Sequence, residues 1–168
     1  DYITCDALGM SQEDPTIVVT PIETKTFVGG AGVVAAHAKR LGADVSYFTV
    51  LGDNDDAGNL ARSWLGEQGI DFVAQTDETR PTTRKQRFRA NGKTLLRVNH
   101  LRQHAIGLAL VKTFVRQIEE RLARTDLVLF SDFNYGCLPQ GLVDAIAVRA
   151  AERGVMMAAD SQASSQMA

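Results

Sequence analysis

The stretch VGGAGVVAAHAKRLG, from Val28 to Gly42, places three glycines where a helix begins. Glycine destabilises a helix by about 1 kcal/mol relative to alanine, so bare backbone at this point needs another explanation. A Gly-Gly pair ahead of a helix lets a ligand touch the main chain and exposes amide donors at the positive helix end. A tight loop-to-helix turn, or close packing of the helix against a sheet, explains the same residues without a ligand, and the glycines alone leave both interpretations open.

Strands and helices alternate outward from this stretch. Helical spacing of apolar residues and β-rich runs predict a helix up to Arg40, a strand over Val45–Val50, a helix over 56–68, a short strand over Asp71–Ala74, a helix with the apolar stripe Leu108, Val111, Val115, Ile118 and Leu122, a strand over Leu127–Phe130, a helix over 140–152 and a strand over Val155–Ala159. Such alternation predicts an α/β fold with a parallel sheet covered by helices on both faces.

Two segments do not fit the alternation and predict a small antiparallel sheet of their own, with strands at about 1–27 and 82–98. Asn91-Gly92 between extended runs is a strong hairpin signal, and a two-residue turn would pair Arg87 with Leu96. One face of this hairpin then carries Lys85, Arg87 and Arg89 beside apolar residues. A flap over an anionic small molecule, an exposed sheet edge kept soluble by charge, and a β-ribbon touching nucleic acid all remain open.

Composition excludes some classes of function. The chain has 168 residues, is 45% hydrophobic and carries a net charge of −2, so we expect neither nucleic-acid nor membrane binding. Cys5 and Cys137 lie far apart without metal-ligand spacing; the sequence leaves a disulfide between them open but favours two reduced thiols in a cytoplasmic protein. His100 and His104 have the spacing of a metal pair on a helix, but no third ligand lies nearby, so we expect no metal site here.

Three predicted strands lead into aspartates, at Asp53, Asp132 and Asp160. Ligands of open α/β sheets bind beyond the carboxyl ends of the strands, where an aspartate can bind hydroxyls, hold Mg²⁺ through water or take a proton. Capping of the following helix is the alternative for each of them. Asp53, which begins a run of polar residues, is the best candidate for a cap, whereas Asp132 and Asp160 stop apolar strands abruptly and are better candidates for function.

The order of these features resembles the ribokinase-like (PfkB) carbohydrate kinases, and within them the heptose 7-phosphate kinase domain of ADP-heptose synthase. The similarity rests on an early aspartate at Asp1, Ser11–Pro15, Gly29–Gly32 with Leu41–Ala43, the Gly-Asp block Leu51–Gly58, the lid strand Pro81–Arg87, Leu129–Phe133 and Ala159-Asp160. The resemblance implies a three-layer ribokinase-like fold with a parallel sheet flanked by helices and a small β lid. It identifies residues 1–168 as the N-terminal portion of one such domain, with the nucleotide-binding half absent.

The resemblance also implies a function, phosphoryl transfer from ATP with Mg²⁺ to a hydroxyl of a sugar or sugar phosphate. By analogy Asp1, Gly29, Gly30, Lys85, Arg87 and Asp132 would contact the substrate, and Asp160 would lie near the transferred phosphate. The catalytic base is expected beyond residue 168, so the fragment alone would be inactive. Lid sheets of this family often pair between subunits, so the resemblance also implies a homodimer, and we expect the protein in the cytoplasm.

Three positions depart from the pattern of the heptose kinases. Val33 replaces an asparagine that binds sugar hydroxyls, Tyr135 replaces a lysine, and Asp160-Ser161-Gln162 replaces Asp-Pro-Lys. These changes keep a second hypothesis open, a non-catalytic sugar-phosphate-binding paralogue of the same family.

Overall fold

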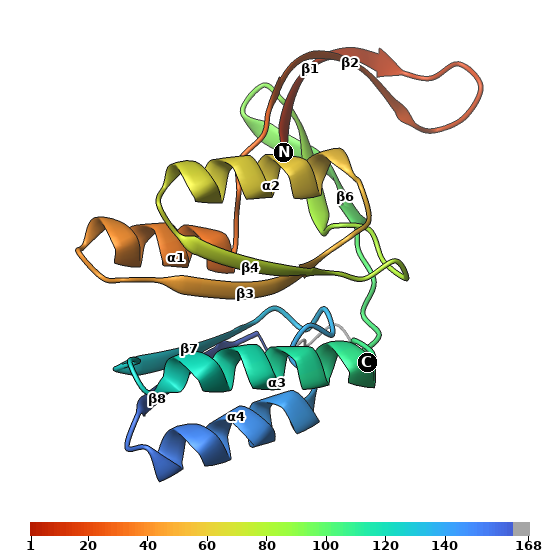
Figure 1. Ribbon diagram of the computed structural model, residues 1–168. Helices are drawn as coiled ribbons and strands as arrows, with labels where there is room; N and C mark the ends of the chain where they lie inside the picture. Colours follow the sequence, from red (N-terminus) through yellow and green to blue (C-terminus); the bar gives the residue numbers. More distant parts are fainter. Residues whose placement is uncertain (163–168) are drawn as a thin grey trace.

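The computed structural model describes residues 1–162, which form a body of strands and helices with a separate sheet above it (Figure 1). In chain order the elements are β1 (Tyr2–Met10), β2 (Ile17–Lys25), α1 (Ala31–Arg40), β3 (Ser46–Leu51), α2 (Asp56–Glu67), β4 (Asp71–Thr76), β5 (Arg84–Ala90), β6 (Lys93–His100), α3 (Leu108–Leu122), β7 (Leu127–Asp132), α4 (Gln140–Glu152) and β8 (Met156–Ser161). The α/β alternation predicted from the sequence is confirmed.

Two pairs of parallel strands make up the centre of the body. β3 pairs with β4 from Ser46↔Asp71 to Leu51↔Thr76, and β7 pairs with β8 from Leu127↔Met156 to Asp132↔Ser161. Each pair encloses a helix in its connection, as parallel strands require. α1 and α2 lie on one side of the strands and α3 and α4 on the other, which gives three layers (Figure 1).

Alternating side chains of β3 pack against the helices on both faces of the strands. Tyr47 packs with Ala35, Ala36 and Leu65 of α1 and α2, and its ring stacks on Phe72 of β4. Phe48 points to the opposite face and packs on the cluster around Phe114 of α3 and Leu142 and Ile146 of α4. Because side chains alternate along a strand, a single strand joins the two cores.

The remaining strands form the lid, a four-stranded sheet in the order β2-β1-β5-β6. Its two hairpins are antiparallel as expected, but the hairpins join through a parallel pairing of β1 and β5, with Tyr2 opposite Arg87. Asn91 and Gly92 both have positive φ, as a tight two-residue hairpin turn demands. The strands of this sheet lie within Tyr2–Lys25 and Arg84–His100.

The register of the second hairpin differs from the prediction. Ala90 pairs with Lys93 and Arg89 with Thr94, but an irregularity after Phe88 shifts the rest, so Arg87 lies opposite Arg97 and not Leu96. An extra residue on β6 at this point is a β-bulge, which twists the strand locally. The predicted pairing of Arg87 with Leu96 was therefore wrong, because the alternation of side chains along a strand does not reveal a bulge.

Three smaller expectations were also tested. Leu108 is 78% exposed at the start of α3, so it does not belong to the buried stripe; Phe114 lies there instead. His100 ends β6 and His104 lies in the following loop, so they do not share a helix. Both cysteines are free thiols. Within residues 1–162, no helix is both long and apolar enough to cross a bilayer.

Candidate functional site

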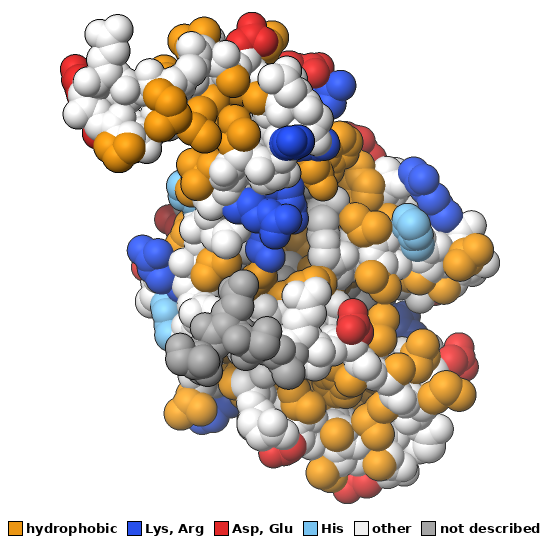
Figure 2. Space-filling model, turned by 180° about the vertical axis from the view of Figure 1, so that it is seen from behind, with side chains coloured by type: hydrophobic (Ala, Val, Ile, Leu, Met, Phe, Trp, Pro, Cys, Tyr) orange, Lys and Arg blue, Asp and Glu red, His pale blue; other side chains and the backbone are white. Residues whose placement is uncertain are grey.

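A cavity of about 2160 Å³ lies beneath the lid and continues between β3 and β7. Small-molecule pockets usually occupy about 300–1,000 Å³, so a ligand would fill only a part of it. Its wall includes six of the seven residues singled out from the sequence, namely Asp1, Gly29, Gly30, Lys85, Arg87 and Asp132. Asp160 does not line it. Figure 2 shows Lys and Arg side chains gathered where the lid meets the body.

The diglycine lies at the amino end of α1 and opens onto this cavity. Gly30 is the N-cap, with φ 55° and ψ −135°, and no side chain caps the helix. A Cβ at Gly30 would lie 3.2 Å from the Phe133 ring, whereas a Cβ at Gly29 would meet no atom of residues 1–162 within 4 Å. Backbone conformation and the Phe133 contact therefore explain Gly30, while the bare backbone at Gly29 is left for a ligand.

The lid strand β5 contributes the cations of the site. Arg84, Lys85 and Arg87 all line the cavity. The guanidinium of Arg87 also lies 5.4 Å from the centre of the Tyr2 ring, which holds it against β1. Cations at the rim of a partly enclosed cavity attract phosphate and carboxylate groups.

Asp1 is already engaged by its neighbours. Its carboxylate, with the side chain 2% exposed, accepts a 2.6 Å hydrogen bond from Arg84 Nε and a 3.4 Å bond from Gln86 Nε2. Its backbone nitrogen donates to the Lys85 oxygen at 2.6 Å. The carboxylate thus anchors the start of β1 to β5, and Asp1 forms part of the cavity wall.

Asp132 ends β7 and does not cap a helix. Its Oδ1 accepts the backbone N–H of Asn134 at 2.8 Å, and its Oδ2 accepts the Ser161 hydroxyl at 3.1 Å. Pro139, and not Asp132, holds the N-cap position of α4. The capping alternative is therefore wrong for Asp132, whose carboxylate is held in one orientation at the cavity wall. Asp160 is exposed within β8, opposite Ser131.

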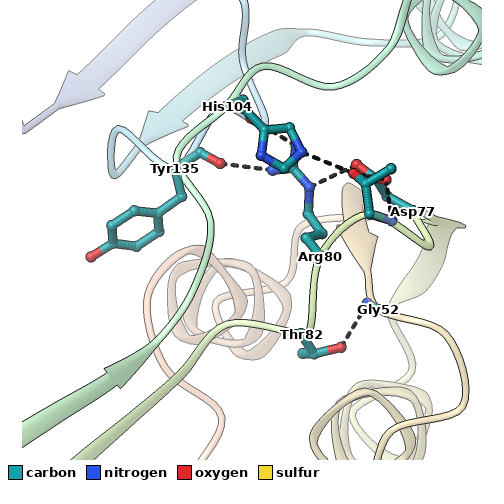
Figure 3. A network of polar contacts seen from close by, with 7 residues as sticks. Gly52, Asp77, Arg80, Thr82, His104 and Tyr135 are labelled. Atoms are coloured by element: carbon teal, nitrogen blue, oxygen red, sulfur yellow. Dashed lines mark hydrogen bonds and ion pairs between the residues drawn. The ribbon is translucent and has the colours of Figure 1, made fainter.

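A buried guanidinium joins three loops beside the site (Figure 3). Arg80 is 7% exposed; its Nε bonds to Asp77 Oδ2 at 2.7 Å, its Nη1 to the Tyr135 oxygen at 2.8 Å and its Nη2 to the His104 oxygen at 2.7 Å. Thr79 Oγ1 links Asp77 Oδ1, at 2.6 Å, with His104 Nε2, at 2.9 Å. These contacts satisfy a buried charge, which is costly without partners.

Burial alone would raise the pKa of Asp77. The hydrogen bonds from Thr79 and Arg80, together with the Arg80 charge, outweigh burial and hold this pKa below its ordinary value. Asp77 is therefore ionised at neutral pH and pairs with Arg80 as a full charge.

The Gly-Asp block fixes the start of the lid strand. Asp55 accepts from the Gly58 nitrogen at 2.7 Å as N-cap of α2, and from the Thr82 nitrogen at 2.6 Å. A Cβ at Gly52 would lie 2.5 Å from Asp55 Oδ2 and 2.6 Å from the Thr82 nitrogen, so only glycine fits there. The cap is thus Asp55, and the interpretation of Asp53 as the cap was wrong.

The residues 1–162 bring together no group of three or more His, Cys, Asp or Glu side chains that could hold a metal ion. Mg²⁺ does not need such a cage when a substrate is phosphorylated, because it takes one or two carboxylates and fills its shell with phosphate oxygens and water. Asp132, fixed by two hydrogen bonds at the cavity wall, is a suitable carboxylate for that arrangement.

Sequence reasoning missed the residues that hold the site in shape. Arg80, Asp77 and Asp55 are charged residues in loops, and such residues are usually solvated. Two sequence signals were available. Arg80 directly precedes Pro81, and Asp55 lies within the Gly-Asp block, and both are positions at which the chain turns between elements. Phe133, which packs on Gly30, was quoted only as part of a motif.

Comparison with known proteins identifies the relatives of this chain. The chain matches the pfkB family of carbohydrate kinases over residues 1–168. It is 31% identical over 148 residues to the bifunctional protein HldE of Desulfatibacillum aliphaticivorans, covering 88% of this chain and 30% of that protein. It is 32% identical over 153 residues to HldE of Paramagnetospirillum magneticum, covering 90% and 31%. The chain thus spans about a third of the length of these curated relatives.

Solved structures show the same fold at lower identity. A carbohydrate kinase from Agrobacterium tumefaciens superposes with a TM-score of 0.64 at 19% identity, covering 94% of this chain and 49% of that one. Phosphofructokinase-2 from Escherichia coli, in complex with fructose-6-phosphate, gives 0.58 at 16% identity, covering 96% and 51%. The ribokinase-like fold is confirmed. Because the family match extends over the whole sequence, this protein belongs to the pfkB family of carbohydrate kinases.

Proposed function

We propose that the chain is the substrate-binding part of an ATP-dependent kinase that phosphorylates a hydroxyl of a sugar phosphate, as a heptose 7-phosphate kinase does. One observation carries the proposal: lid cations, the amino end of α1 and the carboxylate of Asp132 line one cavity. Phosphoryl transfer depends mostly on positioning and on neutralising charge, and this set of groups supplies both.

Each group has a role that follows from its chemistry. Lys85 and Arg87 pair with the phosphate that the substrate already carries, since both present charged donors at the cavity. The bare backbone at Gly29 and Gly30 allows close approach of sugar hydroxyls to α1. Asp1 orients a hydroxyl from the wall, and Asp132 accepts a hydrogen bond from the substrate or holds water on Mg²⁺.

ATP would enter with Mg²⁺, and Mg²⁺ supplies charge neutralisation for the phosphates when it is bound. Asp132 is the residue of this chain that suits it, and we propose that Asp160 lies near the transferred phosphate once substrates are bound. Because ATP is the phosphate donor, we place the reaction in the cytoplasm. We propose that the catalytic base lies outside these 168 residues.

The test is ADP release by the full-length protein with a panel of sugars and sugar phosphates, including heptose 7-phosphate and fructose 6-phosphate. We expect turnover of at least one sugar phosphate, and a large rise in KM for that substrate in Lys85→Met and Arg87→Met. Lys93→Met is the matched control, because Lys93 lies at the hairpin turn and does not line the cavity. If no sugar or sugar phosphate of the panel is turned over, the proposed kinase activity is wrong.

A second candidate is a sugar-phosphate-binding paralogue without catalysis. It is favoured by Val33, which offers no hydrogen bond to sugar hydroxyls, and by Tyr135, whose ring occupies the cavity wall where the heptose kinases have a lysine. Calorimetry that detects heptose 7-phosphate binding without ADP release would support this candidate. Efficient phosphorylation would exclude it.

We further propose that two copies pair through their lids. The hairpin of β1 and β2 exposes Leu8, Met10, Ile17 and Ile22, each more than half accessible, and β2 is an open edge of the lid sheet. Exposed apolar patches of this kind favour association. Sedimentation should show a dimer that Ile22→Asp dissociates, whereas Leu60→Asp on α2 of the body should leave it intact. A dimer that survives Ile22→Asp would contradict the lid interface.

A further inference from the structure

The ring of Tyr135 lies under the ammonium of Lys85 at the wall of the candidate site. Lys85 Nζ is 4.9 Å from the ring centre, within the range in which an aromatic face attracts a cation. Phe133 stacks on Tyr135 with ring centres 6.3 Å apart and an interplanar angle of 21°. All three side chains line the cavity, so the contact joins the lid to the body at the site itself.

The backbone of Tyr135 is held firmly. Its oxygen accepts the 2.8 Å hydrogen bond from the buried Arg80, and the oxygen of Gly136 accepts one from the Ile106 nitrogen at 3.0 Å. Gly136 has φ 73° and packs so closely on the His104 backbone that no side chain fits. Figure 3 shows the Tyr135 ring pointing away from this anchored backbone. The anchored backbone and the stacked Phe133 ring together hold the Tyr135 ring at the cavity wall.

Lys85, in contrast, is a long side chain that needs a partner to stay in one place. Among residues 1–162 its ammonium forms no ion pair with a carboxylate, and it lies over the face of the Tyr135 ring. An aromatic face holds a cation without neutralising it, because the ring carries no net charge. An arriving anion therefore does not have to displace a paired carboxylate of residues 1–162 from this ammonium.

We propose that Tyr135 is a positioning residue for Lys85, which it holds at the cavity wall to receive the phosphate of a phosphorylated sugar. This inference rests on the proposed function, in which Lys85 binds that phosphate. It makes Tyr135 a determinant of specificity for phosphorylated over unphosphorylated sugars. Arg80 holds the backbone of Tyr135, and the Tyr135 ring in turn holds the Lys85 ammonium.

A double-mutant cycle tests the coupling in the full-length protein with heptose 7-phosphate and, in parallel, fructose 6-phosphate. Tyr135→Leu should raise KM for the sugar phosphate by about threefold to thirtyfold, the range of a cation–π contact, with little change in kcat. Tyr135→Phe, which keeps the aromatic face, should recover most of the affinity. In a Lys85→Met background, Tyr135→Leu should have no further effect.

Two more readouts separate positioning from mere packing. The KM for the unphosphorylated sugar should not rise in Tyr135→Leu, and the nuclear magnetic resonance signals of the Lys85 ε-methylene should lose their ring-current shift in Tyr135→Leu but keep it in Tyr135→Phe. The second measurement needs no substrate. It also detects the contact in any variant that retains the wild-type melting temperature.

The outcomes distinguish the two proposals. If wild-type protein turns over a sugar phosphate but Tyr135→Leu and Tyr135→Phe have the same KM, or the losses in the double mutant simply add, the positioning role is wrong. If the ring-current shift is absent in the wild type, it is also wrong. If wild-type protein neither binds nor phosphorylates any sugar phosphate while the ring-current shift is present, the proposed function fails and the Lys85–Tyr135 contact stands without that role.

Discussion

Arg80 Nη1 donates a 2.8 Å hydrogen bond to the backbone oxygen of Tyr135, so a buried guanidinium ties the segment ahead of the lid to the loop after β7. The same guanidinium pairs with Asp77 at the end of β4. The Arg80 side chain therefore connects three loops: the loop after β4, the loop after β7 and the loop after β6. The shape of the site depends on this connection.

Replacing Arg80 by methionine should destabilise the protein severely. The change leaves the Asp77 carboxylate buried without its partner, and breaking a buried pair in this way typically costs about 3–5 kcal/mol. Urea denaturation should show this loss as a lower midpoint. Arg102→Met is the control, since Arg102 is exposed and, within residues 1–162, its side chain bonds only to the neighbouring Leu101 oxygen. Equal urea midpoints for the two variants would contradict a stabilising role for the Arg80–Asp77 pair.

The same pair should make the fold sensitive to acid. The pKa of Asp77 is held below its ordinary value, so its ionised form stabilises the folded state at any pH above the unfolded value of about 3.9. That contribution is lost as pH falls through the lower folded value. Asp77→Asn should be less stable at pH 7 and should lose less stability than wild type between about pH 5 and pH 2. Parallel curves of unfolding free energy against pH would contradict this assignment.

Asp55 should matter for stability, whereas Asp53 should not. Asp55→Ala removes the cap of α2 and the acceptor for the Thr82 nitrogen, and loss of a cap alone costs about 0.5–2 kcal/mol. Asp53 is exposed in the preceding loop, so Asp53→Ala should change stability by less than about 0.5 kcal/mol. Thermal denaturation of the pair measures the difference. A larger loss of stability in Asp53→Ala than in Asp55→Ala would contradict the assignment of Asp55 as the cap.

The fold was predictable from the sequence because its signals are local. The helix over 140–152 follows from apolar spacing between Pro139 and Gly154, and the hairpin follows from Asn91-Gly92, whose positive φ values few other residues allow. The parallel strands read as short apolar runs. Each of these patterns is decided by neighbours within a few residues, so a single sequence contains them.

The supports of the site were not predictable, because they depend on contacts between distant segments. Arg80 meets Tyr135 across 55 positions, and Asp55 meets Thr82 across 27, so no spacing in the sequence reveals either contact. The bulge after Phe88 shifts a register that alternation alone fixes differently. The lining residues were found because the resemblance named them, and the bonds that hold them in place required coordinates.

The two glycines of the diglycine should respond differently to the same change. Gly30→Ala adds a methyl group at φ 55° and brings it within 3.2 Å of the Phe133 ring, so we expect a loss of about 1–2 kcal/mol in stability. In the described part of the chain, the methyl group of Gly29→Ala meets no atom within 4 Å, and Gly29 has no positive φ, so the free energy of unfolding should hardly change. Its methyl group points into the space that we assign to the sugar, so KM for the sugar phosphate should rise instead. Urea denaturation and steady-state kinetics on both variants separate the effects; a destabilised Gly29→Ala with unchanged KM would show that this glycine serves the fold and not the ligand.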